Sequence, residues 1–348
     1  MSRDYAVIGT GYWGSNHVRV ASELLAEGHI DSLTICDIDE ERVADLASNY
    51  GVEYTTDYTT LAERGDDAAV VAAPSPTHRT IATELLDAGL DVLVEKPLAL
   101  SSEDAWAIVD AAAANDRVLA TGHIFRYHPA LCDLKRRIDR GEFGQIRYLN
   151  TTRFAYRAPR SDAGALFSLA VHDVDIYSWL LGRDPERVYC TMDATIREGV
   201  DETATLTLSY GEGTTGVINE SWNVPVTEKR RDLTVVGTER TAHVDYLQNT
   251  ELELHDATMV RDGDAIHARQ EGSRRHETDA YEPLRAEVEA FLEGCETRTS
   301  PSGSGRVGAR AVELLERAEE SARTGQAVDV SLRARGERSL GTVTEQSD

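Results

Sequence analysis

The chain has 348 residues, more than twice the usual length of a single domain, so two domains are expected. Hydrophobic residues make up 41% of it, which excludes a wholly disordered protein. Aspartate and glutamate total 61 against 36 lysines and arginines, and this formal charge of −25 argues against nucleic acid or an anionic membrane as a partner.

The first 122 residues alternate between strand and helix patterns. Short apolar runs bounded by turn residues predict strands at 5–8, 32–36, 68–73, 91–94 and 118–121. Segments with helical spacing lie between them, at about 14–27, 40–50, 77–88 and 102–114. Strands separated by helices indicate βαβ units, so we expect an α/β domain with a doubly wound parallel sheet over residues 1–122.

Residues 123–332 have a different pattern. Alternating segments predict strands near 146–156, 187–197, 203–210, 214–222, 232–237, 241–246 and 250–255. Helices are expected at about 129–140, 170–181, 282–292 and 307–324. We therefore predict an α+β domain with a large open, mostly antiparallel sheet. We expect the last helix to pack back on the first domain, and residues 333–348 to form a flexible tail.

A glycine-rich loop lies between the first predicted strand and the first predicted helix. It has the spacing GxGxxG and consists of Gly9, Thr10, Gly11, Tyr12, Trp13 and Gly14. Gly9 permits a tight turn, Gly11 lets a pyrophosphate approach the backbone, and Gly14 lets the helix pack closely on the strand. Phosphate would then bind the free N–H groups at the start of the helix. The loop therefore predicts a Rossmann-type dinucleotide site.

Asp37 ends the next predicted strand, where such sites carry the carboxylate that binds the ribose. This position favours NAD, because the 2′-phosphate of NADP would meet a like charge. Arg42 could pair with that phosphate, so NADP stays open as an alternative.

Glu95, Lys96 and Pro97 follow the predicted strand 91–94, at the edge of a parallel sheet where ligands bind. A lysine is usually a solvated surface charge. This chain, however, has only three lysines, and Lys96 lies on the ligand edge. A cation there could bind a substrate hydroxyl and stabilise the negative charge that develops on it.

With these residues the chain resembles the glucose–fructose oxidoreductase/inositol dehydrogenase family (Gfo/Idh/MocA). The matching segments, in family order, are residues 7–14, 73–78, 95–100, 122–129 and 172–175. The resemblance covers residues 3 to 332 and implies NAD(P)-dependent oxidation of a hydroxyl group, with Lys96 as the residue that binds it. It also implies a cis Lys96–Pro97 bond. The cofactor contacts that it implies beyond the glycine-rich loop and Asp37 are Ala73, Pro74, Ser75, Thr77, His78, Glu95 and Lys96.

The resemblance assigns a second catalytic residue, His172, as the base that takes the hydroxyl proton. In the family this helix reads D-x-G-x-H, but Ser168 stands where the aspartate belongs and adds no charge to the base. Three explanations stay open: another acid such as Asp162 or Asp173 substitutes, the substrate differs, or activity is reduced. No second histidine has ligand spacing to His172, which argues against a metal site.

Within the family, the chain most resembles members that act on nucleotide sugars, through residues 11–16, 122–129, 160–162 and 169–173. This implies a UDP-N-acetylglucosamine (or uronate) 3-dehydrogenase, which oxidises a ring hydroxyl to a ketone. The residues predicted to bind the substrate are Arg126, Tyr127, Arg160, Ser168 and Asp173. Cations that could bind a diphosphate cluster in the sequence as Arg126, Arg153, Arg157 and Arg160.

Two alternatives remain. A free sugar or inositol would undergo the same chemistry. A catalytically weakened, NAD-binding regulatory protein is favoured only by the missing aspartate at position 168.

The remaining features concern the setting of the protein. Four cysteines are scattered singly, no apolar run reaches eighteen residues, and residues 1–8 pass directly into a strand pattern. We therefore expect a cytoplasmic protein with reduced thiols, no signal peptide and no membrane span. The widely spread acids suggest a halophilic source. We expect the exposed face of the open sheet to pair subunits into a homodimer or homotetramer.

Overall fold

The computed structural model describes residues 3–158, 163–226 and 229–333. These residues form two compact units. The first comprises the described parts of 1–123, 284–312 and 333–348, and the second comprises those of 124–283 and 313–332. The expected boundary at residue 122 thus differs by one residue, and residues 284–312, which we expected in the second domain, belong to the first unit. The predicted tail lies outside the described residues except for Arg333.

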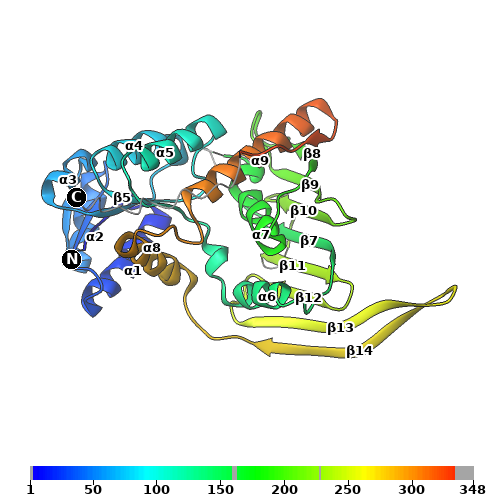
Figure 1. The fold of residues 1–348 in the computed structure, drawn as a ribbon. Coiled ribbons are helices and arrows are strands. Elements are labelled where there is room, and N and C mark those ends of the chain that lie inside the picture. Colours follow the sequence, from blue (N-terminus) through cyan, green and yellow to red (C-terminus); the bar gives the residue numbers. More distant parts are fainter. Residues whose placement is uncertain (1–2, 159–162, 227–228, 334–348) are drawn as a thin grey trace, which may run out of the picture. The chain divides into compact units, whose positions relative to one another are not determined.

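A parallel sheet forms the centre of the first unit (Figure 1). Its described strands are β1 (Asp4–Ile8), β2 (Ser32–Cys36), β3 (Glu53–Thr55), β4 (Ala68–Val71), β5 (Asp91–Val94) and β6 (Leu119–Thr121). They lie in the order β3-β2-β1-β4-β5-β6. Successive strands are added on one side of β1 as far as β3, and from β4 onward they are added on its other side. The central strands are almost wholly buried, as strands covered by helices on both faces are. The predicted doubly wound sheet is confirmed.

Helices connect these strands. They are α1 (Tyr12–Glu27), α2 (Glu40–Tyr50), α3 (Leu61–Arg64), α4 (His78–Asp87) and α5 (Ser102–Ala114), and α8 (Pro283–Thr297) joins the unit later in the chain. Side chains cap the first turns of two of these helices. In α2, Asp39 accepts a hydrogen bond from the backbone N–H of Arg42, and in α5, Ser101 accepts one from that of Asp104. No helix among the described residues has the length and apolar character that a bilayer crossing requires.

The second unit contains a nine-stranded sheet, counted over its described residues. Its strands are β7 (Ile146–Phe154), β8 (Arg187–Asp193), β9 (Thr203–Ser209), β10 (Thr215–Ser221), β11 (Arg230–Gly237), β12 (Thr241–Asp245), β13 (Glu251–Asp262), β14 (Ala265–Glu277) and β15 (Val328–Asp329). The order is β14-β13-β12-β11-β7-β10-β9-β8-β15, and of the described neighbours only β7 and β10 run parallel. The predicted open, mostly antiparallel sheet is confirmed.

Helices cover one face of this sheet. α6 (Pro129–Asp139) and α7 (Val171–Leu181) lie along it, and the second half of α9 (Gly305–Thr324) joins β8 through a hydrogen bond from the Cys190 backbone N–H to the Ser321 hydroxyl (Figure 1). Apolar residues that face the helices alternate with half-exposed polar ones, as in β9. Within the described residues no helix covers the opposite face. Subunit pairing through that face stays a prediction.

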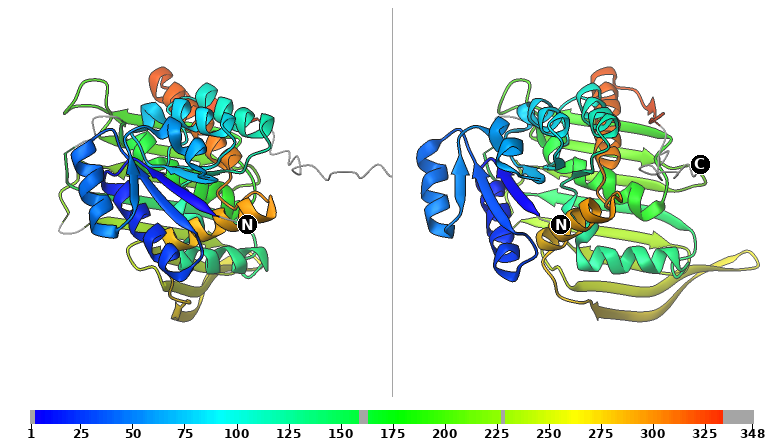
Figure 2. Two further views of the ribbon diagram at one scale, coloured as in Figure 1. Left: turned by 90° about the vertical axis from the view of Figure 1, so that its left-hand side faces the viewer. Right: turned by 60° about the vertical axis from the view of Figure 1, so that its left-hand side comes forward.

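The sequence did not predict the hairpin of β13 and β14. Its outer part extends past the other strands of the sheet (Figure 2). Residues 265–277 are exposed along nearly their whole length, so they have no buried face and no alternating apolar pattern. An edge strand of this kind leaves no signal in the sequence.

Glu287 on α8 is a buried carboxyl group in the core of the first unit. Its side chain is 2% exposed, and neither of its oxygens has a hydrogen-bond partner among the described residues. Burial, and then the charge of Glu95, raises its pKa well above the ordinary value. Glu287 therefore holds a proton more tightly in the folded protein than in the unfolded chain.

We expect Glu287→Gln to remove a pH dependence of stability. Above the ordinary glutamate pKa of about 4.3, the folded state keeps a proton that the unfolded state has lost. The free energy of unfolding should then fall by up to about 1.4 kcal/mol per pH unit until the folded-state pKa is reached. Urea denaturation between pH 5 and 8 measures this slope. Glu293→Gln, at an exposed position of the same helix, is the control. Parallel pH profiles for wild type and Glu287→Gln would contradict the assignment.

Candidate active site

The glycine-rich loop has the backbone geometry that a dinucleotide site needs. Gly9 has a φ of +87°, and a Cβ there would lie 2.7 Å from the carbonyl oxygen of Ala72. A Cβ on Gly14 would lie 1.7 Å from the carbonyl oxygen of Gly9. A Cβ on Gly11, by contrast, would meet no described atom within 4 Å. Two glycines are thus required by packing, and the third leaves its backbone open to a ligand.

The first turn of α1 can receive a phosphate. Gly11 is its N-cap, and no side chain among the described residues caps it, so the N–H groups of the first turn are available. Tyr12 and Trp13 lie on this turn with their rings edge to face, 5.8 Å apart, and Tyr12 is 82% exposed. The residues present therefore fit the pyrophosphate of NAD.

Asp37 follows β2 and lies next to the glycine-rich loop. Its carboxylate accepts the backbone N–H and the hydroxyl of Thr10, at 2.7 and 2.8 Å, and the backbone N–H of Asp39 at 3.0 Å. Burial alone would raise its pKa, but these hydrogen bonds lower it, so the group is an anion. Arg42 binds Asp39 at 2.6 Å and lies 3.5 Å from Asp37. An anion at the ribose position favours NAD over NADP.

The loop after β4 carries the next predicted cofactor residues. Ala73 and Pro74 lead into a short 3₁₀ turn, Ser75–Thr77, and the Thr77 hydroxyl donates to the Pro74 carbonyl at 2.8 Å. Ser75 is buried. His78 begins α4 and is 1% exposed, so its ring faces the protein interior.

Glu95, Lys96 and Pro97 form a turn directly after β5. Glu95 is buried, and its carboxylate lies 2.9 Å from the Nε2 atom of His17. It also accepts the backbone N–H of Lys96 at 3.1 Å. Lys96 itself is half-buried, and the Lys96–Pro97 bond is cis, as the family resemblance implied. The predicted cofactor residues of the first unit therefore lie together at the carboxyl ends of β1, β2, β4 and β5.

His172 and Ser168 lie on a helix of the second unit that changes its winding. Residues Leu166–Ala170 form a π-helical turn that continues directly into α7. Such turns are rare and are found frequently at functional sites. Both side chains are buried, and the His172 ring meets the Phe125 ring edge to face at 4.9 Å.

A buried ionic cluster adjoins His172. Arg153 of β7 binds Asp173, which is wholly buried, and the hydroxyl of Tyr246 donates to the same carboxylate at 3.2 Å. The Arg153 guanidinium lies 4.5 Å from the ring centres of both Phe125 and Tyr246. Asp173, which we predicted to bind substrate, is thus engaged inside the protein.

Glu220 of β10 is the second acid of this cluster, 3.8 Å from Arg153. Burial, and then the charge of Asp173, raises the pKa of Glu220 well above the ordinary value. Of the two acids, Asp173 hydrogen-bonds Arg153 directly, and Glu220 lies farther from it.

Arg126, also predicted to bind substrate, makes hydrogen bonds of 2.7 to 3.1 Å to both carboxylate oxygens of Asp175. Its guanidinium also lies 5.6 Å from the ring centre of Trp179. Tyr127 ends the adjoining 3₁₀ turn and is half-buried. Two of the four arginines that could bind a diphosphate, Arg126 and Arg153, are therefore paired with carboxylates.

The other two arginines differ. Arg157 is exposed and lies 5.1 Å from the ring centre of Trp222. Arg160 lies outside the described residues, as does Asp162.

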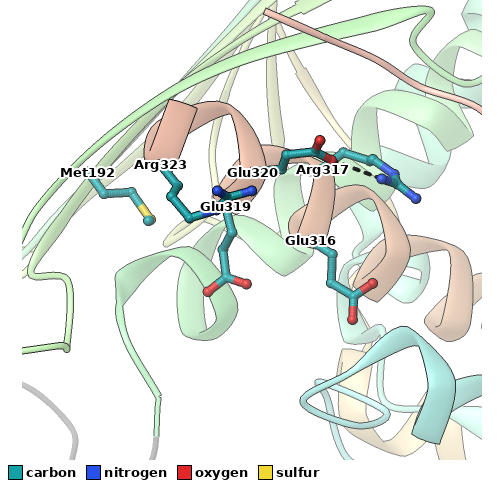
Figure 3. A pocket seen from close by; sticks show the side chains of 6 residues that line it. All are labelled: Met192, Glu316, Arg317, Glu319, Glu320 and Arg323. Carbon is teal, nitrogen blue, oxygen red and sulfur yellow. Dashed lines mark hydrogen bonds and ion pairs between the residues drawn. The ribbon is translucent and has the colours of Figure 1, made fainter. Parts of the chain in front are cut away.

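An open hollow of the second unit lies elsewhere (Figure 3). Its described lining is one residue of β8 and five of α9: Met192, Glu316, Arg317, Glu319, Glu320 and Arg323. Arg317 and Glu320 neutralise each other at 2.9 Å. None of these six residues belongs to the predicted site, and five are charged, so we do not assign the hollow to the reaction.

Sequence reasoning missed several residues that hold the site together: His17, Phe125, Glu220 and Tyr246. Each acts through a long-range contact. The one local signal is that His17 lies within the apolar face of α1, next to Val18 and four residues before Ala21, where a polar residue needs a buried partner.

Two family models match the chain. Residues 3–123 match the model described as "Oxidoreductase family, NAD-binding Rossmann fold", and residues 132–243 match the GFO/IDH/MocA C-terminal domain. The chain belongs to the GFO/IDH/MocA family. It is accordingly an NAD(P)-dependent oxidoreductase with an NAD-binding Rossmann domain.

Individual relatives agree with this assignment. UDP-N-acetylglucosamine 3-dehydrogenase from Acidithiobacillus ferrooxidans is 32% identical over 82% of this chain and 86% of its own length. A solved structure of that enzyme has a TM-score of 0.79, with 26% identity over 93% of this chain and 99% of that one. Inositol 2-dehydrogenase 1 from Saccharopolyspora erythraea is 32% identical over 52% of this chain and 55% of its own length. Levoglucosan dehydrogenase in complex with NADH, 21% identical over 96% of this chain and all of its own, has a TM-score of 0.84 and shares the fold.

We expect Arg153→Met to destabilise the protein by about 3–5 kcal/mol, because it leaves the buried Asp173 anion unpaired. The double variant Arg153→Met/Asp173→Leu should recover most of that loss, since it removes both charges. Urea denaturation of both single variants and the double variant measures the coupling.

Arg157→Met is the control. Because Arg157 is exposed, this substitution should lower the free energy of unfolding by less than about 1 kcal/mol. Losses in the double variant that equal the sum of the two single losses would show that Arg153 and Asp173 are not energetically paired.

Proposed function

We propose that the protein is an NAD-dependent dehydrogenase that oxidises a ring hydroxyl of a nucleotide sugar such as UDP-N-acetylglucosamine to a ketone. The observation that carries this proposal is the half-buried Lys96 in the turn after β5 of an NAD-binding Rossmann sheet. The choice of a nucleotide sugar is supported by the Acidithiobacillus ferrooxidans relative, which is named for that substrate.

The roles of the two catalytic residues follow from their chemistry. The ammonium group of Lys96 donates a hydrogen bond to the hydroxyl oxygen and stabilises the negative charge that develops there as its proton leaves. His172 accepts that proton. When bound, NAD supplies the acceptor for the hydride that leaves the same carbon.

Ser168 bears on the choice of substrate. Asp173 is wholly buried and paired with Arg153, which argues against it as the replacement for the family aspartate. Of the three explanations above, we favour a different substrate: a serine at this position donates or accepts one hydrogen bond and adds no charge. The exposed Arg157 is our candidate for a contact with the diphosphate.

Two other functions are tested beside this one. The inositol dehydrogenase relative favours a free polyol, although it matches only half of this chain. A regulatory protein that binds NAD without turnover would also have the observed phosphate loop.

We expect NAD reduction with one UDP-sugar from a panel of UDP-sugars, free sugars and inositols, assayed with NAD and NADP in molar salt. Lys96→Met should lower kcat by about 10²–10³-fold, because the developing charge loses its cation. Lys135→Met is a matched control, since Lys135 lies on α6 and pairs with Asp139.

Three outcomes would change the proposal. Turnover of a free polyol but of no UDP-sugar would show that the substrate is a free polyol and not a nucleotide sugar. NAD binding without turnover on the whole panel would favour the regulatory protein. Equal rates for wild type and Lys96→Met would remove Lys96 from the mechanism.

A further inference from the structure

The Glu95–Lys96–Pro97 turn is held on both sides of Lys96 by a buried histidine. We propose that His17 and His78 are positioning residues that fix the backbone of Lys96 relative to the elements that bind NAD. This inference rests on the proposed role of Lys96 as the residue that binds the substrate hydroxyl.

His17 holds the turn before Lys96. It lies on α1, the helix that begins at the phosphate loop, and is 1% exposed. Its Nε2 atom is 2.9 Å from one carboxylate oxygen of Glu95, and the other oxygen accepts the backbone N–H of Lys96 at 3.1 Å. One carboxylate therefore joins the helix that receives the phosphate to the amide of Lys96.

The Glu95 side chain has little room to move. A Cβ on Gly122, at the end of β6, would lie 3.1 Å from the second carboxylate oxygen of Glu95. Burial alone would raise the pKa of Glu95, but its contacts with His17 and Lys96 lower it below the ordinary value. Glu95 is thus an anion fixed from α1, β6 and its own turn.

His78 holds the turn after Lys96. Its Nδ1 atom lies 3.0 Å from the carbonyl oxygen of Pro97, and its Nε2 atom lies 2.9 Å from that of Ala73. A neutral ring has one N–H group, so it donates to one of these two carbonyl oxygens and lies against the other. The His78 ring therefore lies between the loop after β4 and the turn after β5, and supports both.

The charges around Lys96 within this unit have a simple pattern. Glu95 is a neighbouring anion, and the pKa of the buried Glu287 is raised well above the ordinary value. Burial lowers the pKa of His78, so its ring is neutral near pH 7. His17 faces Glu95. The charge of Glu95 therefore favours the ammonium form of Lys96.

The loss of the His17 or the His78 contact is expected to lower kcat strongly, because it would let Lys96 shift. Displacing a catalytic group by about 1 Å can cost about 10²-fold in rate even when the substituted residue is remote from the chemistry. Loss of either histidine contact should therefore lower kcat while the phosphate loop continues to bind NAD.

The first measurement does not require turnover. The three lysines allow each amine to be followed by peptide mass spectrometry after brief acylation of the cofactor-free protein with acetic anhydride. Glu95→Gln is nearly isosteric and removes the charge that favours the ammonium form. Lys96 should then be acylated faster at pH 8, by about tenfold for each unit by which its affinity for the proton falls. Lys135 is the internal reference.

The second measurement is steady-state kinetics. His17→Phe and His78→Phe keep a ring but lose its nitrogens, and each should lower kcat by about 10–100-fold with less than about threefold change in the KM for NAD. His17→Gln and His78→Gln retain a hydrogen-bond donor and should restore most of the rate. His29→Phe, at an exposed histidine of the same unit, is the control.

The outcomes separate this inference from the proposed function. Wild-type kcat in both Phe variants, or an unchanged rate of Lys96 acylation in Glu95→Gln, would overturn the positioning role. If a Phe variant does not fold, its Gln counterpart and the acylation of Lys96 in Glu95→Gln still test the positioning role. Absence of wild-type turnover on every substrate would refute the proposed function, and acylation would then test the geometry alone.

Discussion

The buried carboxylate of Glu95 is the interaction on which the first unit depends for its chemistry. An unpaired anion in that position would cost several kcal/mol, so the fold is stable only with its partners in place. Those partners come from α1 and from the Lys96 backbone, and Gly122, directly after β6, lies beside the carboxylate where a Cβ would be crowded. The same requirement that makes the anion tolerable therefore fixes the lysine next to it.

The second unit also contains a buried acidic side chain that is held by a fixed partner. Arg153 is buried between two aromatic rings, and its anion is Asp173, the residue after His172. The start of α7 is thereby held to the central strands of the sheet. Asp173 is thus bound to Arg153 in the core, which argues against it as a replacement for the carboxylate that Ser168 lacks. In both units a buried acidic side chain with a fixed partner lies one residue from a proposed catalytic group.

The sequence predicted what depends on local patterns. The parallel strands are short apolar runs such as 68–73, and the phosphate loop and Glu95–Lys96–Pro97 are contiguous motifs, so the Rossmann sheet and its ligand edge could be recognised. The family resemblance added the cis Lys96–Pro97 bond. What the sequence did not contain were pairings between distant segments: His17 with Glu95, Arg153 with Asp173, and the exposed β14, which has no buried face to generate a pattern.

Contacts between distant segments change the interpretation of charged residues that the sequence places near the catalytic motifs. Arg126 and Asp173 looked like substrate ligands because charged residues near a catalytic motif usually face the ligand. Both face carboxylate or guanidinium partners inside the fold. The family resemblance implied that His78 is a cofactor contact, and its ring lies between two backbone loops.

The central claim is that this chain removes a hydride from a sugar carbon and delivers it to NAD. The most direct test uses UDP-N-acetylglucosamine deuterated at C3, followed by mass spectrometry and proton NMR of the recovered NADH. The account predicts deuterium at C4 of the nicotinamide and a UDP-linked 3-ketosugar as product. NADH without deuterium would contradict oxidation at C3, and recovery of unchanged sugar and NAD would contradict oxidation of this substrate altogether.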